Sequence, residues 1–419
     1  MGQYIIEGCN RLGGTVKTQG AKNSALPILA ATVAVGNPCV IHNCPQLSDI
    51  DSTIRILRCL GCKVQRADEM VFVDAGNLSQ RKISDVLMRE MRSSIIFLGA
   101  LLSATGEAVI SAPGGCDIGL RPIDIHLASM RKLGVHISES HGEIRCTCRR
   151  IKGGKIVLPF PSVGATENII LASVKSGTVT TIINAAREPE IVDLAMFLNS
   201  CGARISGAGE STVVIEGVER FNSSQYAIMP DRIVACTYMA AAAVTGSTVV
   251  VDEVIPSHIT PVFSAFEQAG CRIETSGKQL RITSPERLKA FDRIQTMPYP
   301  GFPTDCQAIM MAVASVSKGI TIISENIFEN RFKHIGELRR MGADIKAQDK
   351  IAVVNGVERL QGAFVNSTDL RAGAALVVAG LCAEGTTTVE KISYIDRGYA
   401  AFAENLSAIG AVIRRKDKL

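Results

Sequence analysis

The sequence has few aromatic residues, no long apolar run and no concentrated basic stretch, and each absence excludes a class of protein. Aromatic residues make up 5% of the chain and the net charge is +5, whereas nucleic-acid-binding proteins usually carry a basic stripe or stacking aromatic side chains. A membrane-spanning helix needs about 18 consecutive apolar residues, and the longest run, 374–383, holds ten and is interrupted by Gly380. We therefore expect neither a nucleic-acid partner nor a membrane segment.

We also expect neither a secretion signal nor a zinc or disulfide site. The N-terminus has no basic region followed by an apolar core. The 13 cysteines are odd in number and scattered among apolar neighbours. Their close pairs, Cys59 with Cys62 and Cys146 with Cys148, have no His or Cys partners at zinc-site spacing. We expect reduced and mostly buried thiols, a cytoplasmic location and no metal site.

What is present is a globular composition in a chain long enough for two domains. Hydrophobic residues account for 47% and charged residues for 20% of the 419 residues. Single domains usually contain about 100–200 residues, so the length predicts two domains. The mild positive charge suits small anionic ligands.

An internal repeat is the strongest organisational signal in the sequence. In six segments a short helical run ends at a glycine that a β-branched residue follows three positions later, and successive glycines lie 73, 68, 68, 72 and 68 residues apart. A second glycine precedes each of these by 23 to 28 residues. A glycine at the end of a helix suits a left-handed cap. The two series are Gly61, Gly134, Gly202, Gly270, Gly342 and Gly410, and Gly36, Gly106, Gly177, Gly246, Gly319 and Gly385.

Each repeat alternates strand-like and helix-like segments over about 70 residues. A β-rich stretch such as 178–183 precedes an amphipathic stretch such as 191–198. An Ala-rich helix such as 238–244 is apolar nearly all round, which predicts burial on every side. One repeat cannot bury its own sheet and helices. The predicted fold class is therefore α/β: a two-domain, inside-out α/β barrel of six βαβαββ-type repeats, three per domain, with the helices inside.

The second repeat contains an unusual connection between strand and helix. It begins with Pro113, Gly114, Gly115 and Cys116, which is too flexible and polar to be core. A thiol displayed on such a loop beside Arg121 can have a lowered pKa. From these residues alone, a tight turn that carries a buried cysteine is an equally good interpretation.

The motif Pro113-Gly-Gly-Cys116-x-Ile-Gly-x-Arg121-Pro122 resembles the catalytic loop of the UDP-N-acetylglucosamine 1-carboxyvinyltransferases, a branch of the enolpyruvyl transferase family. The similarity extends over the whole chain, and that family's fold requires a sixfold repeat. The other matching stretches are 20–25, 161–168, 184–190, 302–305, 328–332, 368–372 and 395–399.

The resemblance implies a reaction and a domain arrangement. The enolpyruvyl group of phosphoenolpyruvate would pass to the 3′-hydroxyl of UDP-N-acetylglucosamine by addition and elimination of phosphate, the first committed step toward peptidoglycan precursors. No metal, organic cofactor or obligatory protein partner is implied. One domain would span 22–229 and carry a mobile catalytic loop at about 112–122. The other would combine 1–21 with 230–419, and the active site would lie in the cleft between them.

The resemblance also implies roles for individual residues. Asp305 would be the general base that takes the sugar hydroxyl proton, and Cys116 the general acid that protonates the methylene carbon or adds transiently to the enolpyruvyl group. Lys22, Arg121 and Arg397 would hold phosphoenolpyruvate, because cations pair with its carboxylate and phosphate.

A second set of residues would bind the sugar nucleotide. Ser162 begins a helix whose backbone N–H groups could bind the diphosphate, although a well-capped helix explains the same residues. Phe160 stands where some relatives have Lys, so a cationic contact there is absent or replaced. The other implied substrate contacts are Asn23, Arg92, Pro122, Ile123, Asp124, Val163, Gly164, Ile327, Arg331, Asp369 and Arg371.

Two alternatives remain at this level. A 5-enolpyruvylshikimate-3-phosphate synthase would share the fold and the donor, but it has no cysteine loop of this kind and the motif at 162–166 argues against it. A catalytically silent repeat protein that binds anionic metabolites is the second. The presence of Cys116, Asp305, Lys22 and Arg397 together argues against that one.

Overall fold

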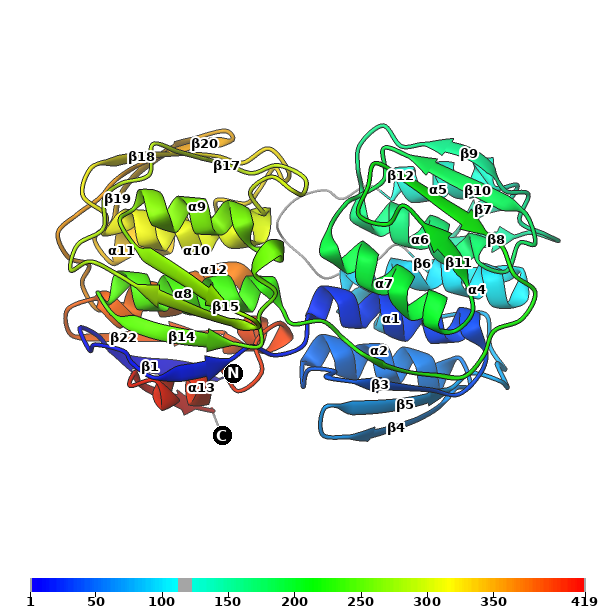
Figure 1. Cartoon of the computed structure of the whole chain (residues 1–419), viewed down its shortest axis with the longest axis horizontal. Coiled ribbons are helices and arrows are strands. Elements are labelled where there is room, and N and C mark those ends of the chain that lie inside the picture. Colours follow the sequence, from blue (N-terminus) through cyan, green and yellow to red (C-terminus); the bar gives the residue numbers. More distant parts are fainter. Residues whose placement is uncertain (1, 112–122, 418–419) are drawn as a thin grey trace. The chain divides into compact units, whose positions relative to one another are not determined.

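The computed structural model describes residues 2–111 and 123–417, without the side chain of Arg92. These residues form two compact units. The first unit contains residues 20–111 and 123–229, and the second contains residues 2–19 and 230–417. Both units consist of small β-sheets and packed helices (Figure 1).

The described strands of the first unit form three sheets. Each sheet contains an antiparallel hairpin, and in two of them an edge strand runs parallel to its neighbour. In order across each sheet, the strands are β13 (Ser224–Ala227), β3 (Cys39–His42), β5 (Met70–Asp74) and β4 (Lys63–Ala67); β11 (Arg204–Ser206), β12 (Thr212–Glu216), β10 (Val179–Ile183) and β9 (Gly154–Val157); and β6 (Glu107–Ser111), β8 (Glu143–Thr147) and β7 (His136–Ser140).

The described strands of the second unit also form three sheets. In each of them one edge strand runs parallel to its neighbour and the other two strand pairs are antiparallel. In order, they are β15 (Arg272–Ser276), β16 (Gln279–Thr283), β14 (Thr248–Asp252) and β2 (Thr15–Lys17); β17 (Arg293–Gln295), β18 (Ile320–Ser324), β20 (Ile351–Asn355) and β19 (Asp344–Gln348); and β21 (Phe364–Asn366), β22 (Thr386–Glu390), β1 (Gln3–Glu7) and β23 (Val412–Lys416).

Three strands pair with strands that are remote from them in the chain. Strand β2 directly precedes the first helix of the first unit, yet it pairs in parallel with β14 of the second unit. Strand β13 comes just before the second unit's first helix, yet it pairs in parallel with β3 of the first unit. Strand β1 pairs with both β22 and β23. The N-terminal residues therefore complete two sheets of the second unit.

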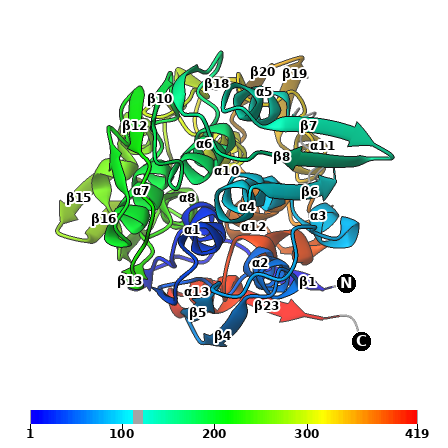
Figure 2. The same ribbon diagram turned by 90° about the vertical axis from the view of Figure 1, so that its right-hand side faces the viewer.

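Three helices of the first unit pack against one another and are largely buried: α1, α4 and α6. Figure 2 shows them among the strands of this unit. The helices of the first unit are α1 (Lys22–Val35), α2 (Ser48–Cys59), α3 (Asp85–Glu90), the 3₁₀ helix η1 (Arg92–Ile96), α4 (Phe97–Thr105), α5 (Asp124–Lys132), α6 (Val163–Ser173) and α7 (Pro189–Ser200).

The second unit has a corresponding set of packed helices: α8, α10 and α12. Almost every residue of these helices is buried, as their apolar and Ala-rich sequences predict. The helices of the second unit are α8 (Arg232–Val244), η2 (Pro256–His258), α9 (Thr260–Gln268), α10 (Thr304–Ser315), α11 (Ile335–Arg340), α12 (Leu370–Cys382), η3 (Ile392–Arg397) and α13 (Phe402–Ala408).

The repeat glycines and the cysteines behave as the sequence predicts. All twelve glycines of the two series have a positive φ, between 60° and 119°. Gly36, for example, closes α1 with φ 74° and donates its N–H to Thr32. An L-residue with a Cβ would be strained in that conformation. The twelve described cysteines are free, and eight of them are buried.

Candidate active site

Asp305 lies in the first turn of α10, where two arginines hold its carboxylate. Nη2 of Arg331 donates to Oδ1 at 2.9 Å, and Nη2 of Arg371 donates to Oδ2 at 3.3 Å. Both arginine side chains are 3% exposed, whereas that of Asp305 is 28% exposed. The two buried guanidinium groups stabilise the ionised carboxylate and fix its orientation, and the carboxylate is the part of this cluster that a solute can reach.

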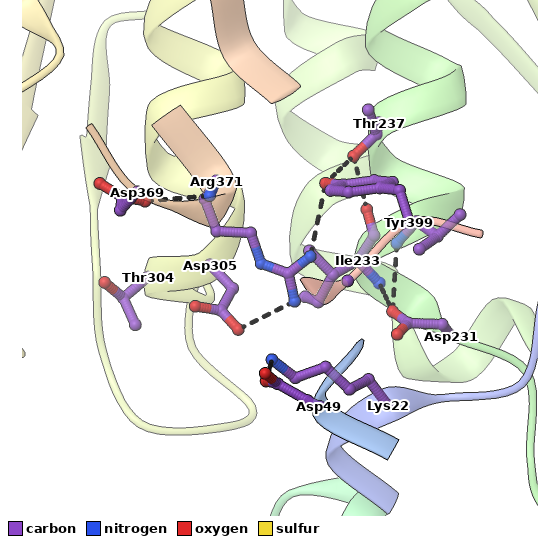
Figure 3. A network of polar contacts seen from close by, with 12 residues as sticks. Lys22, Asp49, Asp231, Ile233, Thr237, Thr304, Asp305, Asp369, Arg371 and Tyr399 are labelled. Carbon is purple, nitrogen blue, oxygen red and sulfur yellow. Dashed lines mark hydrogen bonds and ion pairs between the residues drawn. The ribbon is translucent and has the colours of Figure 1, made fainter. Parts of the chain in front are cut away.

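Further contacts hold Arg371 in place (Figure 3). Asp369 caps α12 by accepting the backbone N–H of Arg371 at 2.9 Å. Nη1 of Arg371 lies 3.4 Å from the hydroxyl of Tyr399, and that hydroxyl lies 2.8 Å from Oγ1 of Thr237. The guanidinium carbon is 5.6 Å from the centroid of the Tyr399 ring. Arg371 is therefore fixed from three sides.

The electrostatics of this cluster favour a charged arginine next to a neutral tyrosine. Burial opposes the charge on Arg371, but Asp305, Tyr399 and Asp231 together outweigh it and raise the arginine pKa above its usual range. Burial raises the pKa of Tyr399 to about 12. Arg371 thus remains a cation that neutralises Asp305, while Tyr399 acts as a hydrogen-bonding partner.

Arg397 ends the 3₁₀ helix η3 and is half-buried. The residues that follow it are held by Gln19, which belongs to the same unit. Nε2 of Gln19 donates to the carbonyl of Gly398 at 3.1 Å, and its Oε1 accepts the N–H of Ala400 at 2.8 Å. The N-terminal segment therefore holds the backbone that directly follows Arg397.

In the first unit, Lys22 begins α1 and forms a buried ion pair with Asp49 of α2 (Figure 3). Nζ of Lys22 lies 2.8 Å from Oδ2 of Asp49, and the side chains are 10% and 5% exposed. The carboxylate compensates the buried positive charge. Asn23, the next residue, is half-buried. Sequence analysis did not identify Asp49, because no local pattern connects it to Lys22.

The start of α6 is a helix N-terminus that the side chain of Ser162 caps. Oγ of Ser162 accepts the N–H of Ala165 at 3.4 Å, and Ser162, Val163 and Gly164 are half-buried. A Cβ on Gly164 would lie 3.0 Å from the imidazole of His126. Backbone N–H groups at such a terminus attract anions, and the lack of a side chain at Gly164 keeps this helix start closely packed on α5.

Asn168 of α6 connects the elements around this helix start. Its Nδ2 donates to the carbonyl of Ile95 at 3.1 Å and lies 2.8 Å from Nδ1 of His126. Its Oδ1 accepts the N–H of Gly99 at 2.7 Å. Asn168 thereby ties η1, which begins at Arg92, and α5 to α6. Sequence analysis named the matching stretch that includes Asn168 but gave the residue no role.

Several predicted residues fall outside these clusters. Cys116, Arg121 and Pro122 lie outside the described residues, as does the whole of the predicted loop at 112–122. Ile123 is the N-cap of α5, and Asp124, in its first turn, is exposed. Ile327 is half-buried in the segment that follows β18.

Within the residues that the structure describes, no group of three or more His, Cys, Asp or Glu side chains could hold a metal ion. None of the described helices is long and apolar enough to cross a membrane.

Comparison with known proteins gives full-length matches. The family model for EPSP synthase (3-phosphoshikimate 1-carboxyvinyltransferase) matches residues 6–406. A protein of Caldanaerobacter subterraneus named UDP-N-acetylglucosamine 1-carboxyvinyltransferase 2 is 52% identical over 415 residues, which cover 99% of this chain and 100% of that protein. A protein of Symbiobacterium thermophilum named UDP-N-acetylglucosamine 1-carboxyvinyltransferase 1 is 48% identical and covers 99% of this chain and 95% of its own length.

Two solved structures are similar over the whole chain. The crystal structure of the enolpyruvyl transferase NikO from Streptomyces tendae has a TM-score of 0.90 at 25% identity, covering 100% of this chain and 99% of that one. A structure of EPSP synthase from Acinetobacter baumannii has a TM-score of 0.76 at 18% identity and covers 100% of both chains. At that identity the second comparison establishes the fold alone.

Proposed function

This chain belongs to the EPSP synthase family of enolpyruvyl transferases, and we propose that it transfers the enolpyruvyl group of phosphoenolpyruvate to the 3′-hydroxyl of UDP-N-acetylglucosamine with release of phosphate. The observation that carries the proposal is its full-length similarity to UDP-N-acetylglucosamine 1-carboxyvinyltransferases. The product would enter peptidoglycan precursor synthesis.

In the proposed reaction, Asp305 takes the proton of the sugar hydroxyl. The oxygen then attacks C2 of phosphoenolpyruvate while C3 gains a proton from Cys116, which gives a tetrahedral intermediate. Cys116, now a thiolate, takes back a proton from C3 while phosphate leaves with the proton that Asp305 holds, which regenerates the double bond, leaves the enol ether and restores both residues. The support for Asp305 is that its carboxylate is held by Arg331 and Arg371 at 2.9 and 3.3 Å and remains the reachable part of the cluster.

Cations hold the donor in this proposal. Lys22, Arg121 and Arg397 would bind the phosphate and carboxylate of phosphoenolpyruvate and stabilise the charge that develops in the intermediate. The buried pair of Lys22 with Asp49 supports this role, since it fixes the ammonium group at the start of α1. Arg331 and Arg371 act mainly by orienting Asp305, because both are buried against it.

The start of α6 would bind the diphosphate of the sugar nucleotide. Ser162, Val163 and Gly164 offer half-buried backbone at a helix N-terminus. Asn23, Ile327 and Asp305 would contact the sugar and the base, and Arg92, Pro122, Ile123, Asp124 and Asp369 complete the proposed substrate contacts. Phe160 is 42% exposed beside this helix start and could contribute apolar contact but no charge.

The proposal includes an architecture and a location. Each unit would be an inside-out α/β barrel of three repeats, which the buried helices α1, α4 and α6, and α8, α10 and α12, support. The domains would be 22–229, and 1–21 with 230–419. With two small anionic metabolites as substrates and free thiols among the described cysteines, the reaction would run in the cytoplasm without a protein partner.

One assay tests the proposal and the alternative acceptor. Phosphate release from phosphoenolpyruvate is measured with UDP-N-acetylglucosamine and, separately, with shikimate 3-phosphate. We expect turnover with the first acceptor alone. Turnover with shikimate 3-phosphate would favour the EPSP synthase activity, and no turnover with either would favour a silent binding protein.

A further inference from the structure

Glu325 is a buried carboxylate that the proposed chemistry does not use. It directly follows β18 and is 1% exposed. The contacts found for it among the described residues are with uncharged donors: two backbone N–H groups and one hydroxyl. Burying a charged group without an opposite charge is unfavourable. A buried glutamate at this position therefore indicates a specific role for its side chain.

The two carboxylate oxygens of Glu325 bind two different parts of the second unit. Oε1 accepts the N–H of Ile327 at 2.9 Å and the N–H of Phe328 at 3.0 Å. Oε2 accepts the hydroxyl of Thr304 at 3.0 Å. One side chain thus shapes the segment after β18 and attaches that segment to the first residue of α10.

The backbone of this segment is anchored independently of the carboxylate. The N–H of Glu325 donates to the carbonyl of Lys350 at 2.8 Å, and the N–H of Asn326 donates to Oγ1 of Thr296 at 2.9 Å. Because these bonds fix the segment where it leaves the sheet, the Glu325 carboxylate approaches Thr304 from a rigid support.

Thr304 is held from two directions, and Asp305 follows it directly. Glu325 binds its hydroxyl, while Nη2 of Arg331 donates to its carbonyl at 3.2 Å and to Oδ1 of Asp305 at 2.9 Å. We infer that Glu325 is a positioning residue that, on the function proposed above, couples the general base Asp305 to the sugar-nucleotide contact at Ile327.

The chemistry of a carboxylate explains why this position carries Glu. Its two oxygens accept three hydrogen bonds in a fixed plane, and bonds to a charged acceptor are stronger than neutral ones. Glutamine can reproduce most of this pattern, because its oxygen accepts the two N–H groups and its amide can donate to the Thr304 hydroxyl. Alanine removes all three bonds and leaves buried donors unpaired.

The test compares Glu325→Ala, Glu325→Gln and Thr304→Val with the matched control Thr321→Val. Thr321 is a buried threonine of β18 whose Oγ1 accepts the N–H of Phe291 at 3.1 Å. Steady-state phosphate release gives kcat and both KM values, thermal unfolding gives Tm, and hydrogen exchange reports on the amides of Ile327 and Phe328.

We expect Glu325→Ala to lower kcat by roughly ten- to hundredfold and to raise the KM for UDP-N-acetylglucosamine about tenfold, because hydrogen bonds to a charged group are worth that range. The KM for phosphoenolpyruvate should change less than about twofold, since the hydrogen bonds that alanine removes adjoin the proposed acceptor site. Thr304→Val should lower kcat about tenfold, and Glu325→Gln should restore most of it. Thr321→Val should lower Tm without changing kcat or KM.

The outcomes separate this inference from the proposed function. If the unmodified chain turns over but Glu325→Ala and Thr304→Val alter only Tm, as the control does, then Glu325 is structural and the inference is wrong. If Glu325→Ala does not fold, Thr304→Val decides alone, because it retains the carboxylate. If the unmodified chain has no activity, the proposed function fails. Unchanged exchange at Ile327 and Phe328 in Glu325→Ala would then still overturn the positioning role.

Discussion

Replacing Asp305 by Asn removes the negative charge between two buried arginines with little change in shape. If Asp305 is the general base, the amide cannot take the sugar hydroxyl proton, and loss of a general base usually costs about 10²–10⁴-fold in rate. We therefore expect kcat of Asp305→Asn to fall by that factor. Binding of UDP-N-acetylglucosamine, measured by calorimetry, should change much less.

The same substitution should lower stability by an amount that the ion-pair geometry sets. Removing one partner of a buried ion pair typically costs about 3–5 kcal/mol. Both arginines are 3% exposed, but Asp305 is 28% exposed. Asparagine can still accept one hydrogen bond, and Arg371 retains Tyr399. We therefore expect the free energy of unfolding to fall by about 3 kcal/mol, the lower end of this range. That corresponds to a fall in Tm of roughly 6–12 °C for a unit of this size.

A surface ion pair provides the control for both readouts. Nη1 of Arg66 lies 2.7 Å from Oδ1 of Asp51, whose side chain is 62% exposed. Exposed pairs contribute about 0–1 kcal/mol, so Asp51→Asn should leave kcat and Tm nearly unchanged. Near-normal kcat in Asp305→Asn would refute the assignment of the base and make Asp231 or Asp369 the next candidate. An unchanged Tm would show that the two arginines do not depend on this carboxylate.

A cysteine, a glycine and a histidine give three further predictions. A phosphonate epoxide that imitates phosphoenolpyruvate should alkylate Cys116 selectively among the 13 cysteines and should leave Cys116→Asp unlabelled; peptide mass spectrometry checks this, and label on another cysteine would contradict it. Gly164→Ala should weaken UDP-N-acetylglucosamine binding about tenfold in calorimetry, because a Cβ there would lie 3.0 Å from His126; unchanged affinity would argue against diphosphate binding at α6. Burial lowers the pKa of His334 to about 4 in the folded chain. In the unfolded chain the same imidazole has a pKa of about 6.5. The free energy of unfolding from denaturant titration should therefore fall as the pH drops from about 6.5 to 4, by up to about 1.4 kcal/mol per pH unit, and His334→Gln should show a smaller fall; identical slopes would refute this.

The sequence alone was sufficient to identify the repeated pattern and to predict that its apolar helices are buried. The left-handed conformation of glycines such as Gly61 is a local backbone property, so their spacing indicated the ends of helices before any packing was known. The burial of α8 and α12 was equally predictable, because a helix that is apolar on every side has no face for water. The motifs also singled out Asp305, Arg331 and Arg371 as site residues.

Tertiary structure decided which of these residues meet. Neither the parallel pairing of β2 with β14 nor that of β13 with β3 follows chain order. The sequence of a short strand does not specify its partner strand, which is selected by the packing of whole repeats. The partners of the buried charged side chains are likewise not specified by the local sequence. Lys22 and Asp49 are 27 positions apart, and Asp305 and Arg371 are 66 apart. A side chain finds such a partner through the position of its helix in space, and the local sequence does not record that position.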